Sequence, residues 1–476
     1  MSASGSQQGM TPAPKPEQQS PWAEAEGRLS RVLRELGQTS WLVTVLAVVV
    51  ALVVGAVLIL AANRDVQASL SYFFAQPTGF LETSFQVLRE AYSSLFRGAV
   101  FDWQAPSAAR SIRPLTETMV YSVPLILAGL GIAIGFRSGM LNIGGQGQII
   151  LGATSAGFLG YALSMPVGLH ALLALAGGIL GGAIWGGIAG VLKARTGANE
   201  VIVTIMLNNI AIYLLAWLLQ QQWYKQTGSN QPLSSSVDES AQLFSLLGSG
   251  FRLHAGFLIA ILATLGVWWL LERSTLGFEF RAIGENPEAA RTAGINVPKA
   301  TALVLVIAGG LAGLGGAAHV LGTEYRLAGG VAGTLGFDAI TVALLGRSKP
   351  LGTFLAGLLL GGLRAGGVLM QAQTGTPIDI VLVLQAVIVL MIAAPPLVRA
   401  IFFLPHADGR PRIRTRRSRR TAKGAAPTGS TTERELQTSG APSAGSRSTG
   451  PSGTQASGTG PNDTQPPSTT TQEPGK

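Results

Sequence analysis

The sequence predicts an all-α integral membrane protein with about ten transmembrane helices. Only 12% of the residues are charged and 47% are hydrophobic, whereas an average soluble domain is about 25% charged. The 62 glycines fit transmembrane helices that pack closely or break inside the membrane. Apolar runs recur along the chain, and a run of roughly 18 residues or more can cross a bilayer as a helix. Such a chain presents an apolar surface to lipid.

Ten apolar segments are predicted to span the membrane. The eighth is too short to cross an average bilayer unaided, so we expect one or more broken or re-entrant segments. The ten segments are Trp41–Ala62, Leu115–Phe136, Asn142–Leu163, Val167–Leu192, Val201–Gln220, His254–Leu271, Ala300–Leu321, Val331–Leu345, Leu351–Met370 and Ile378–Val398.

Basic residues set the predicted orientation, because cytoplasmic loops carry an excess of Lys and Arg. Arginines precede the first span and follow the last, Lys193 and Arg195 follow the fourth, and Arg347 and Lys349 follow the eighth. The pattern predicts a multi-pass protein of the cytoplasmic membrane with both termini cytoplasmic. The first outer loop, Asn63–Pro114, carries five arginines and fits this rule least.

The two ends of the chain differ from the spans in composition. Residues 1–36 begin Ser-, Gln- and Pro-rich and end in an amphipathic stretch, whereas residues 406–476 begin with an arginine-rich run and continue as a Ser-, Thr-, Gly- and Pro-rich tail. Such segments do not bury a core. We therefore expect disordered cytoplasmic tails around one transmembrane domain, residues 37–405. Beside a membrane span the arginine-rich run is a topology signal, so no nucleic-acid partner is predicted.

The chain lacks the side-chain groupings that most catalysis and metal binding need. It has no cysteine, its four histidines show no ligand spacing, and the phosphate-binding string G-x-x-x-x-G-K-[ST] is absent. We expect no catalytic residue, no metal and no cofactor in this chain. A membrane-embedded enzyme would need convergent carboxylates or histidines at membrane depth, and ATP-driven work would need a partner that holds ATP and Mg.

A charged segment, Leu276–Thr301, interrupts the apolar pattern between the sixth and seventh spans. Asn286 and Pro287 predict the start of a short helix, and Gly294 predicts a left-handed end. A short rigid helix of this kind fits a groove on a soluble partner and passes motion to the spans; the alternative is a solvated loop. The predicted coupling loop is about residues 273–299, with Asn286, Pro287, Glu288, Ala289, Ala290, Arg291 and Gly294 as its contact residues.

Polar residues and glycines within the apolar segments are candidates for a solute pathway. Neutral amides suit a neutral polyhydroxylated or heterocyclic solute, and glycines let a helix break and expose backbone groups. An acid at membrane depth is a functional hypothesis by default, and Arg364 could pair with Asp338. The alternatives are helix packing for the amides and helix capping for Asp338. The candidates are Asn142, Gly144, Gly145, Gln146, Gln148, Asn208, Asn209, Phe337 and Asp338.

Four strings, in this order, resemble a family of permeases. They are G-M-L-N-I-G-G-Q-G-Q at 139–148, T-I-M-L-N-x-I-A at 204–211, G-x-N-P-x-A-A-R-x-A-G-I at 284–295 and G-F-D-A-I-x-V-A-L-L-G at 336–346. The chain resembles the ATP-binding cassette (ABC) importer permeases that serve simple sugars, branched-chain amino acids and nucleosides, over roughly Leu115–Leu397. The first string is similar to the pattern F-N-I-G-x-E-G-Q of the nucleoside, basic membrane lipoprotein-linked branch, with Gln146 where that branch commonly has Glu.

The resemblance implies a transport subunit rather than an enzyme. It implies a cytoplasmic ABC ATPase on the coupling loop, a second, homologous permease subunit and an extracytoplasmic substrate-binding lipoprotein, which together import a solute by alternating access. The implied solute is small and neutral, first of all a nucleoside. A ribose-like sugar and a branched-chain amino acid are alternatives within the family, and an ion-coupled secondary transporter that uses Asp338 is the alternative outside it.

Overall fold

The computed structural model describes residues 40–401 except 249, 395–396 and 398–399. Within this part the chain is helical, with three isolated β-bridges and no strand. The predicted tails at 1–36 and 406–476 lie outside the described residues.

Seven helices in the described part are long and apolar enough to cross a membrane, and each overlaps a predicted span. This confirms the all-helical membrane class. They are α2 (Ser40–Ala62), α5 (Ala108–Arg137), α7 (Leu169–Thr196), α8 (Glu200–Leu218), α9 (Gly256–Arg273), α12 (Val297–His319) and α14 (Pro350–Thr374). A π-helix, η2 (Val320–Glu324), continues α12.

The other three predicted spans are shorter or more polar helices, α6 (Gly145–Ala162), α13 (Leu335–Leu345) and α15 (Asp379–Ala393). At 1.5 Å per residue α13 rises about 16 Å, roughly half of a 30 Å hydrocarbon core. It follows a non-helical stretch, residues 325–334. Length and composition therefore support seven of the ten predicted spans directly.

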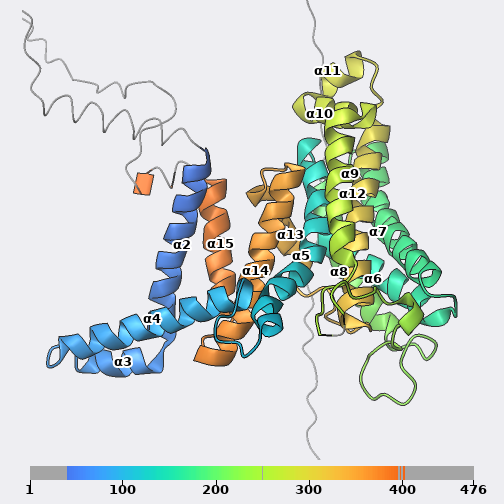
Figure 1. Cartoon of the computed structure of the whole chain (residues 1–476). Coiled ribbons are helices and arrows are strands. Elements are labelled where there is room, and N and C mark those ends of the chain that lie inside the picture. The colour runs from blue at the N-terminus through green and yellow to red at the C-terminus, as the bar shows by residue number, and fades with distance from the viewer. Residues whose placement is uncertain (1–39, 249, 395–396, 398–399, 402–476) are drawn as a thin grey trace, which may run out of the picture. The chain divides into compact units, whose positions relative to one another are not determined.

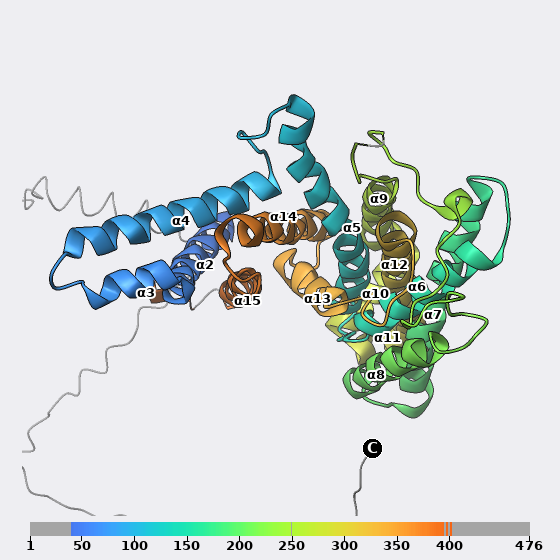
Figure 2. The ribbon, with the colours of Figure 1, turned by 90° about the horizontal axis from the view of Figure 1, so that it is seen from below.

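The first predicted outer loop folds into two further helices, α3 (Arg64–Ser71) and α4 (Pro77–Ala99), which run across the direction of α2 (Figures 1 and 2). Arg97 of α4 is buried, lies 2.7 Å from the carboxylate of Asp102 and donates to Gln373 of α14. This arginine therefore has a structural role, since it joins the end of α4 to Asp102 and to α14.

Tight glycine contacts join α7 and α12 at the centre of the fold. A Cβ atom on Gly182 would lie 2.2 Å from the carbonyl oxygen of Gly309, and one on Gly313 would lie 2.3 Å from that of Gly178. Small residues let helix backbones approach this closely in a membrane. Beside them, α5 is buried without interruption from Ser122 to Gly135. The glycine-rich composition is therefore used for packing.

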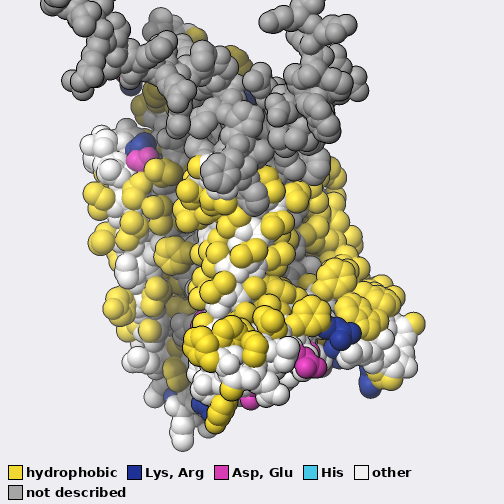
Figure 3. Space-filling view, turned by 90° about the vertical axis from the view of Figure 1, so that its left-hand side faces the viewer, with side chains coloured by type: hydrophobic (Ala, Val, Ile, Leu, Met, Phe, Trp, Pro, Cys, Tyr) yellow, Lys and Arg dark blue, Asp and Glu magenta, His cyan; other side chains and the backbone are white. Residues whose placement is uncertain are grey.

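Apolar side chains also cover the outside of the helices. On α2 the exposed residues Val45, Val49, Val53 and Val57 recur every fourth position, and the face that includes α2 is largely hydrophobic in Figure 3. A surface of this kind suits contact with lipid or with another membrane subunit.

The loops gather in two groups at opposite ends of the helices. At one end Arg137 donates to the backbone of Ser348 and lies 3.7 Å from Glu272. This end also holds α10 (Thr275–Glu285) and α11 (Pro287–Thr292) (Figure 1). At the other end the backbone of Val237 bonds to Tyr325, close to the short helix η1 (Glu239–Ala241).

Candidate functional site

The amides at the start of α6 are buried and bond to protein groups. Asn142 donates to Gln148 Oε1 at 3.1 Å, and Gln148 donates back to Asn142 Oδ1 at 3.3 Å. Asn142 Oδ1 also accepts from the backbone N–H of Gly144 at 3.0 Å. Each side chain is about 1% exposed, so this pair stabilises the turn that leads into α6.

Asn208 joins α8 to the same turn. Its Oδ1 accepts from the N–H of Gly147 at 2.8 Å, and its Nδ2 donates to the carbonyl of Ile143 at 2.9 Å. The neighbouring Asn209 is exposed and bonds within its own helix to Ile205. The two adjacent asparagines therefore have different surroundings, one inside the chain and one on the outer face of α8.

Gln146 connects α6 to α13. Its Oε1 accepts from the N–H of Gly336 at 2.8 Å, and its Nε2 donates to the carbonyl of Gly333 at 2.7 Å. A Cβ atom on Gly336 would lie 2.2 Å from the backbone nitrogen of Gln146. The N-termini of α6 and α13 thus abut, and both atoms of one neutral amide are used. An ionised Glu could make only the first bond.

Asp338 and Arg364 meet, a point that the sequence leaves open. The Arg364 NH1 atom lies 3.7 Å from Asp338 Oδ2, and that oxygen also accepts from Thr334 Oγ1 at 2.9 Å. Gln385 donates to Oδ1 at 3.3 Å. The cluster ties α13, α14 and α15 together, while Phe337 is half exposed beside it.

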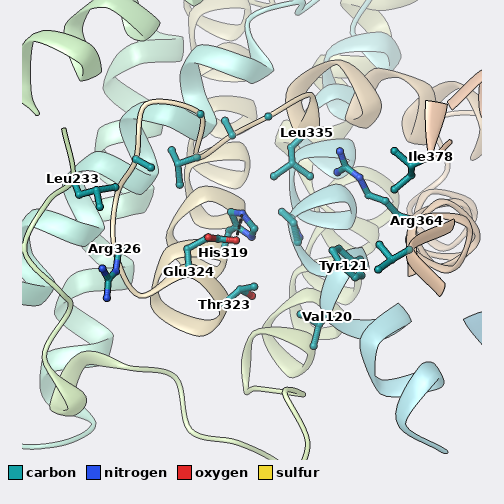
Figure 4. A pocket seen from close by; sticks show the side chains of 17 residues that line it. Val120, Tyr121, Leu233, His319, Thr323, Glu324, Arg326, Leu335, Arg364 and Ile378 are labelled. Carbon is teal, nitrogen blue, oxygen red and sulfur yellow. Dashed lines mark ion pairs between the residues drawn. The ribbon is translucent and has the colours of Figure 1, made fainter. Parts of the chain in front are cut away.

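A cavity of about 640 Å³ lies next to these contacts (Figure 4). Its walls come from α5, from the end of α12 with η2, from residues 326–335 and from α14. In the described part none of the nine predicted pathway residues lines it, although Gly333, which Gln146 holds, and Arg364 do. Its polar residues include His319, Thr323, Glu324 and Arg326.

Sequence reasoning missed this polar group because it treated each histidine alone. A histidine and an acid five residues apart at the end of an apolar segment, His319 and Glu324, were the available signal. In the structure His319 Nε2 lies 3.7 Å from Glu324 Oε1.

His254 supports η2 from the loop before α9. Its Nδ1 accepts from the N–H of Gly256 at 3.1 Å, so Nε2 carries the proton that faces Thr323 Oγ1 at 3.3 Å. A Cβ atom on Gly322 would lie 2.5 Å from the ring. Burial lowers the pKa of His254 to about 4, and the positive charges of His319 and Arg252 add to the effect. The imidazole is therefore neutral at physiological pH.

The predicted helix of the charged segment is present as α11. Asn286 Oδ1 accepts from the N–H groups of Glu288 and Ala289 at 3.0 and 3.1 Å, and Pro287 is the first helical residue. Gly294 has φ +89°, and the N–H of Ile295 bonds to the carbonyl of Ala290. Both predicted ends are confirmed. Ala290 is buried, whereas Glu288, Ala289 and Arg291 are exposed.

A direct backbone contact links this segment to the turn before α6. Gly284 of α10 packs so closely that a Cβ atom on it would lie 2.4 Å from the carbonyl oxygen of Arg137, and Gly139 approaches it from the same turn with φ +70°. Gly284 of α10 is therefore in direct backbone contact with the turn that leads to Asn142 and α6.

The family model for the permease component of a branched-chain amino acid transport system matches residues 115–393. The chain belongs to this permease family. The guanosine ABC transporter permease protein NupP of Bacillus subtilis is 39% identical over 60% of this permease and 82% of its own length. The glucose permease TsgB13 of Haloferax volcanii is 36% identical over 58% and 75%, and the nucleoside permease NupB of Lactococcus lactis is 35% identical over 60% and 81%. No solved structure matches the permease.

Membership of this family makes the chain a multi-pass membrane transport subunit and not itself an enzyme. Its described residues offer no group of three or more His, Cys, Asp or Glu side chains that could hold a metal ion.

Proposed function

We propose that the permease is a membrane subunit of an ABC importer that moves a nucleoside across the cytoplasmic membrane by alternating access. The observation that carries this proposal is its identity of 39% and 35% to permeases whose names specify guanosine and nucleosides. A glucose permease at 36% identity makes a sugar the second candidate.

The abutting ends of α6 and α13 are the proposed moving part of the pathway. Gly144 and Gly145 open α6, and Gln146 holds the stretch before α13, which lines the cavity. In this proposal Asn142, Gln148 and Asn208 keep the turn rigid, while Asn209, Phe337 and Asp338 lie on the side of α8 and α13 that faces the solute or a second subunit. Polar residues on the outer face of a membrane helix favour such a neighbour over lipid.

The segment around 273–299 is the proposed coupling loop. A partner ATPase that holds ATP and Mg would contact the exposed face of α11, from Asn286 to Gly294. Because α10 contacts the turn before α6 through Gly284 and Arg137, motion of the ATPase would reach Gln146 through rigid backbone rather than through a flexible link.

The remaining partners in the proposal are a second permease subunit and an extracytoplasmic substrate-binding lipoprotein. Bacillus subtilis supports a pair, since both NupP and NupQ are guanosine ABC transporter permease proteins similar to this chain. We place ten crossings in a domain of residues 37–405, with α6 as a more polar crossing, α13 and α15 as the two short ones, and both tails, 1–36 and 406–476, cytoplasmic.

The test is uptake of radiolabelled guanosine, ribose and leucine in cells that carry the complete transporter, with an ATPase-inactive strain as the control. Guanosine uptake that is lost in the control supports the proposal. Ribose or leucine uptake in its place would change the solute class, and uptake that ignores the ATPase but collapses with the proton gradient would overturn the mechanism.

A further inference from the structure

The cavity beside α13 has a polar side and a side that is apolar apart from Arg364. Figure 4 shows His319, Thr323 and Glu324 projecting from α12 and η2, with Tyr121, Leu335 and Ile378 across the space from them and Arg364 between Leu335 and Ile378. A volume of about 640 Å³ falls within the range of about 300–1,000 Å³ that small-molecule sites occupy.

The π-helix η2 brings the polar side chains into the cavity. Its wider turn is closed by a bond from the N–H of Tyr325 to the carbonyl of Val320 at 2.8 Å, and Tyr325 adopts φ 56°. A π-turn inside a helix is rare and frequently marks a functional site. The His254 ring supports this turn from behind, against Gly322 and Thr323.

Glu324 is the one acidic side chain that the described residues contribute to the lining of this cavity. Its side chain is 49% exposed and lies 3.7 Å from the His319 ring, so the carboxylate keeps oxygen lone pairs free for a ligand. The positive charge of Arg364 is paired with Asp338. A carboxylate beside an imidazole suits neighbouring hydroxyl groups, because its two oxygens can accept from both.

A second cavity, of about 440 Å³, leads toward the end of the molecule that carries residues 63–107 and 219–255. The two cavities share Tyr121 and Val368 in their linings, and the second also contains Arg110, Arg113 and Arg252. Tyr121 and Val368 therefore lie between the two cavities.

We propose that this cavity is a nucleoside-binding site within the single chain, in which Glu324 and His319 bind the two ribose hydroxyls and Tyr121 with the apolar side contacts the base. The proposal rests on the nucleoside function proposed above and adds the site to it. Free ribose would leave the apolar side unfilled.

The natural absence of cysteine permits a direct occupancy test. In the assembled transporter, Thr323→Cys is labelled with a membrane-impermeant maleimide, with Glu239→Cys as the exposed control on the same end. Guanosine at ten times its half-protecting concentration is expected to slow labelling at position 323 about tenfold, because one site is then free for about a tenth of the time. Labelling at position 239 is expected not to change.

A second variant tests the same site if Thr323→Cys is expressed at too low a level. Glu324→Gln is expected to reduce the preference of uptake for guanosine over 2′,3′-dideoxyguanosine about tenfold, the equivalent of one lost charged hydrogen bond, whereas Glu239→Gln keeps it. The binding lipoprotein is the same in all strains, so its own selectivity does not contribute to the difference in preference between the natural and altered transporters.

The outcomes separate the site from the function. If the unaltered transporter imports guanosine while position 323 stays unprotected and Glu324→Gln keeps the full preference, the site is wrong and the function stands. Equal protection by free ribose would refute contact with the base. If the unaltered transporter imports no nucleoside, the proposed function itself fails.

Discussion

The side-chain amide of Gln146 and the backbone of Gly336 hold the N-termini of α6 and α13 together. Gln146 Oε1 accepts the N–H of Gly336 at 2.8 Å, and the two backbones are so close that Gly336 has no room for a side chain. Two segments nearly two hundred residues apart in the chain are thereby joined beside the cavity.

Gly336→Ala tests this contact. A methyl group there would meet the backbone of Gln146 at 2.2 Å, and because backbone cannot give way cheaply we expect a loss of stability of about 3 kcal/mol or more. The matched control is Gly330→Ala, where no atom lies within 4 Å of the added carbon. Thermal unfolding of the purified protein compares them, and equal melting temperatures would contradict the close approach.

Gln146→Ala should destabilise the protein less than Gly336→Ala and reduce uptake. It leaves the buried N–H of Gly336 without its partner, at about 1–3 kcal/mol, whereas the carbonyl of Gly333 belongs to an exposed residue and costs less. The stability and uptake of Gln146→Glu should lie between those of the natural protein and those of Gln146→Ala, because Glu keeps the bond to Gly336 and loses the bond to Gly333. Transport rates normalised to the amount of protein in the membrane, together with melting temperatures, establish the order.

The ion pair of Asp338 and Arg364 predicts a double-mutant result. Asp338→Asn leaves Arg364 without its countercharge and should cost about 1–2 kcal/mol, a modest value because both side chains keep some exposure. The double variant Asp338→Asn/Arg364→Gln should recover part of this loss, which a thermodynamic cycle of melting experiments measures. Full ATP-dependent uptake in the double variant would also exclude proton relay through Asp338.

The low pKa of His254 predicts a pH dependence of stability. Its folded pKa of about 4 lies below the unfolded value of 6.5, so the unfolded chain binds more protons between these values. The stabilisation is complete above pH 6.5 and is lost as the pH falls toward 4, by about 3 kcal/mol in total at 1.36 kcal/mol per pH unit. The free energy of unfolding is measured against pH for the natural protein and for His254→Gln, and the difference between the two should show this slope. A difference that stays constant with pH would refute the prediction.

Gly294→Pro tests the proposed coupling loop. Gly294 has φ +89°, which proline cannot adopt, so the end of α11 must rearrange. We expect uptake to fall about tenfold or more, as when an essential contact worth 1.4 kcal/mol or more is lost, while the protein still reaches the membrane. Gly197→Pro is the control, since Gly197 also ends a helix with positive φ but lies outside the loop. Normal ATP-driven uptake in Gly294→Pro would argue against the coupling role.

The membrane class, the order of the long helices and the ends of α11 could be predicted from the amino-acid sequence. These are local properties: apolar run length decides whether a helix suits lipid, and Asn286, Pro287 and Gly294 act on backbone within a few residues of themselves. The four motif strings likewise identified the family, which the match over residues 115–393 bears out.

The contacts of the polar residues, in contrast, follow from how the helices pack. Asn142, Gln146 and Asn208 had the composition of a solute site, yet their partners are backbone groups and, for Asn142, the side chain of Gln148, because helices far apart in the chain meet at the start of α6. Tyr121 lies on α5, whereas His319 and Glu324 lie on α12 and on η2, which continues it, so only helix packing brings Tyr121 to the same cavity. Hydrogen-bond partners and cavity walls depend on how helices pack, and that packing is a property of the whole chain.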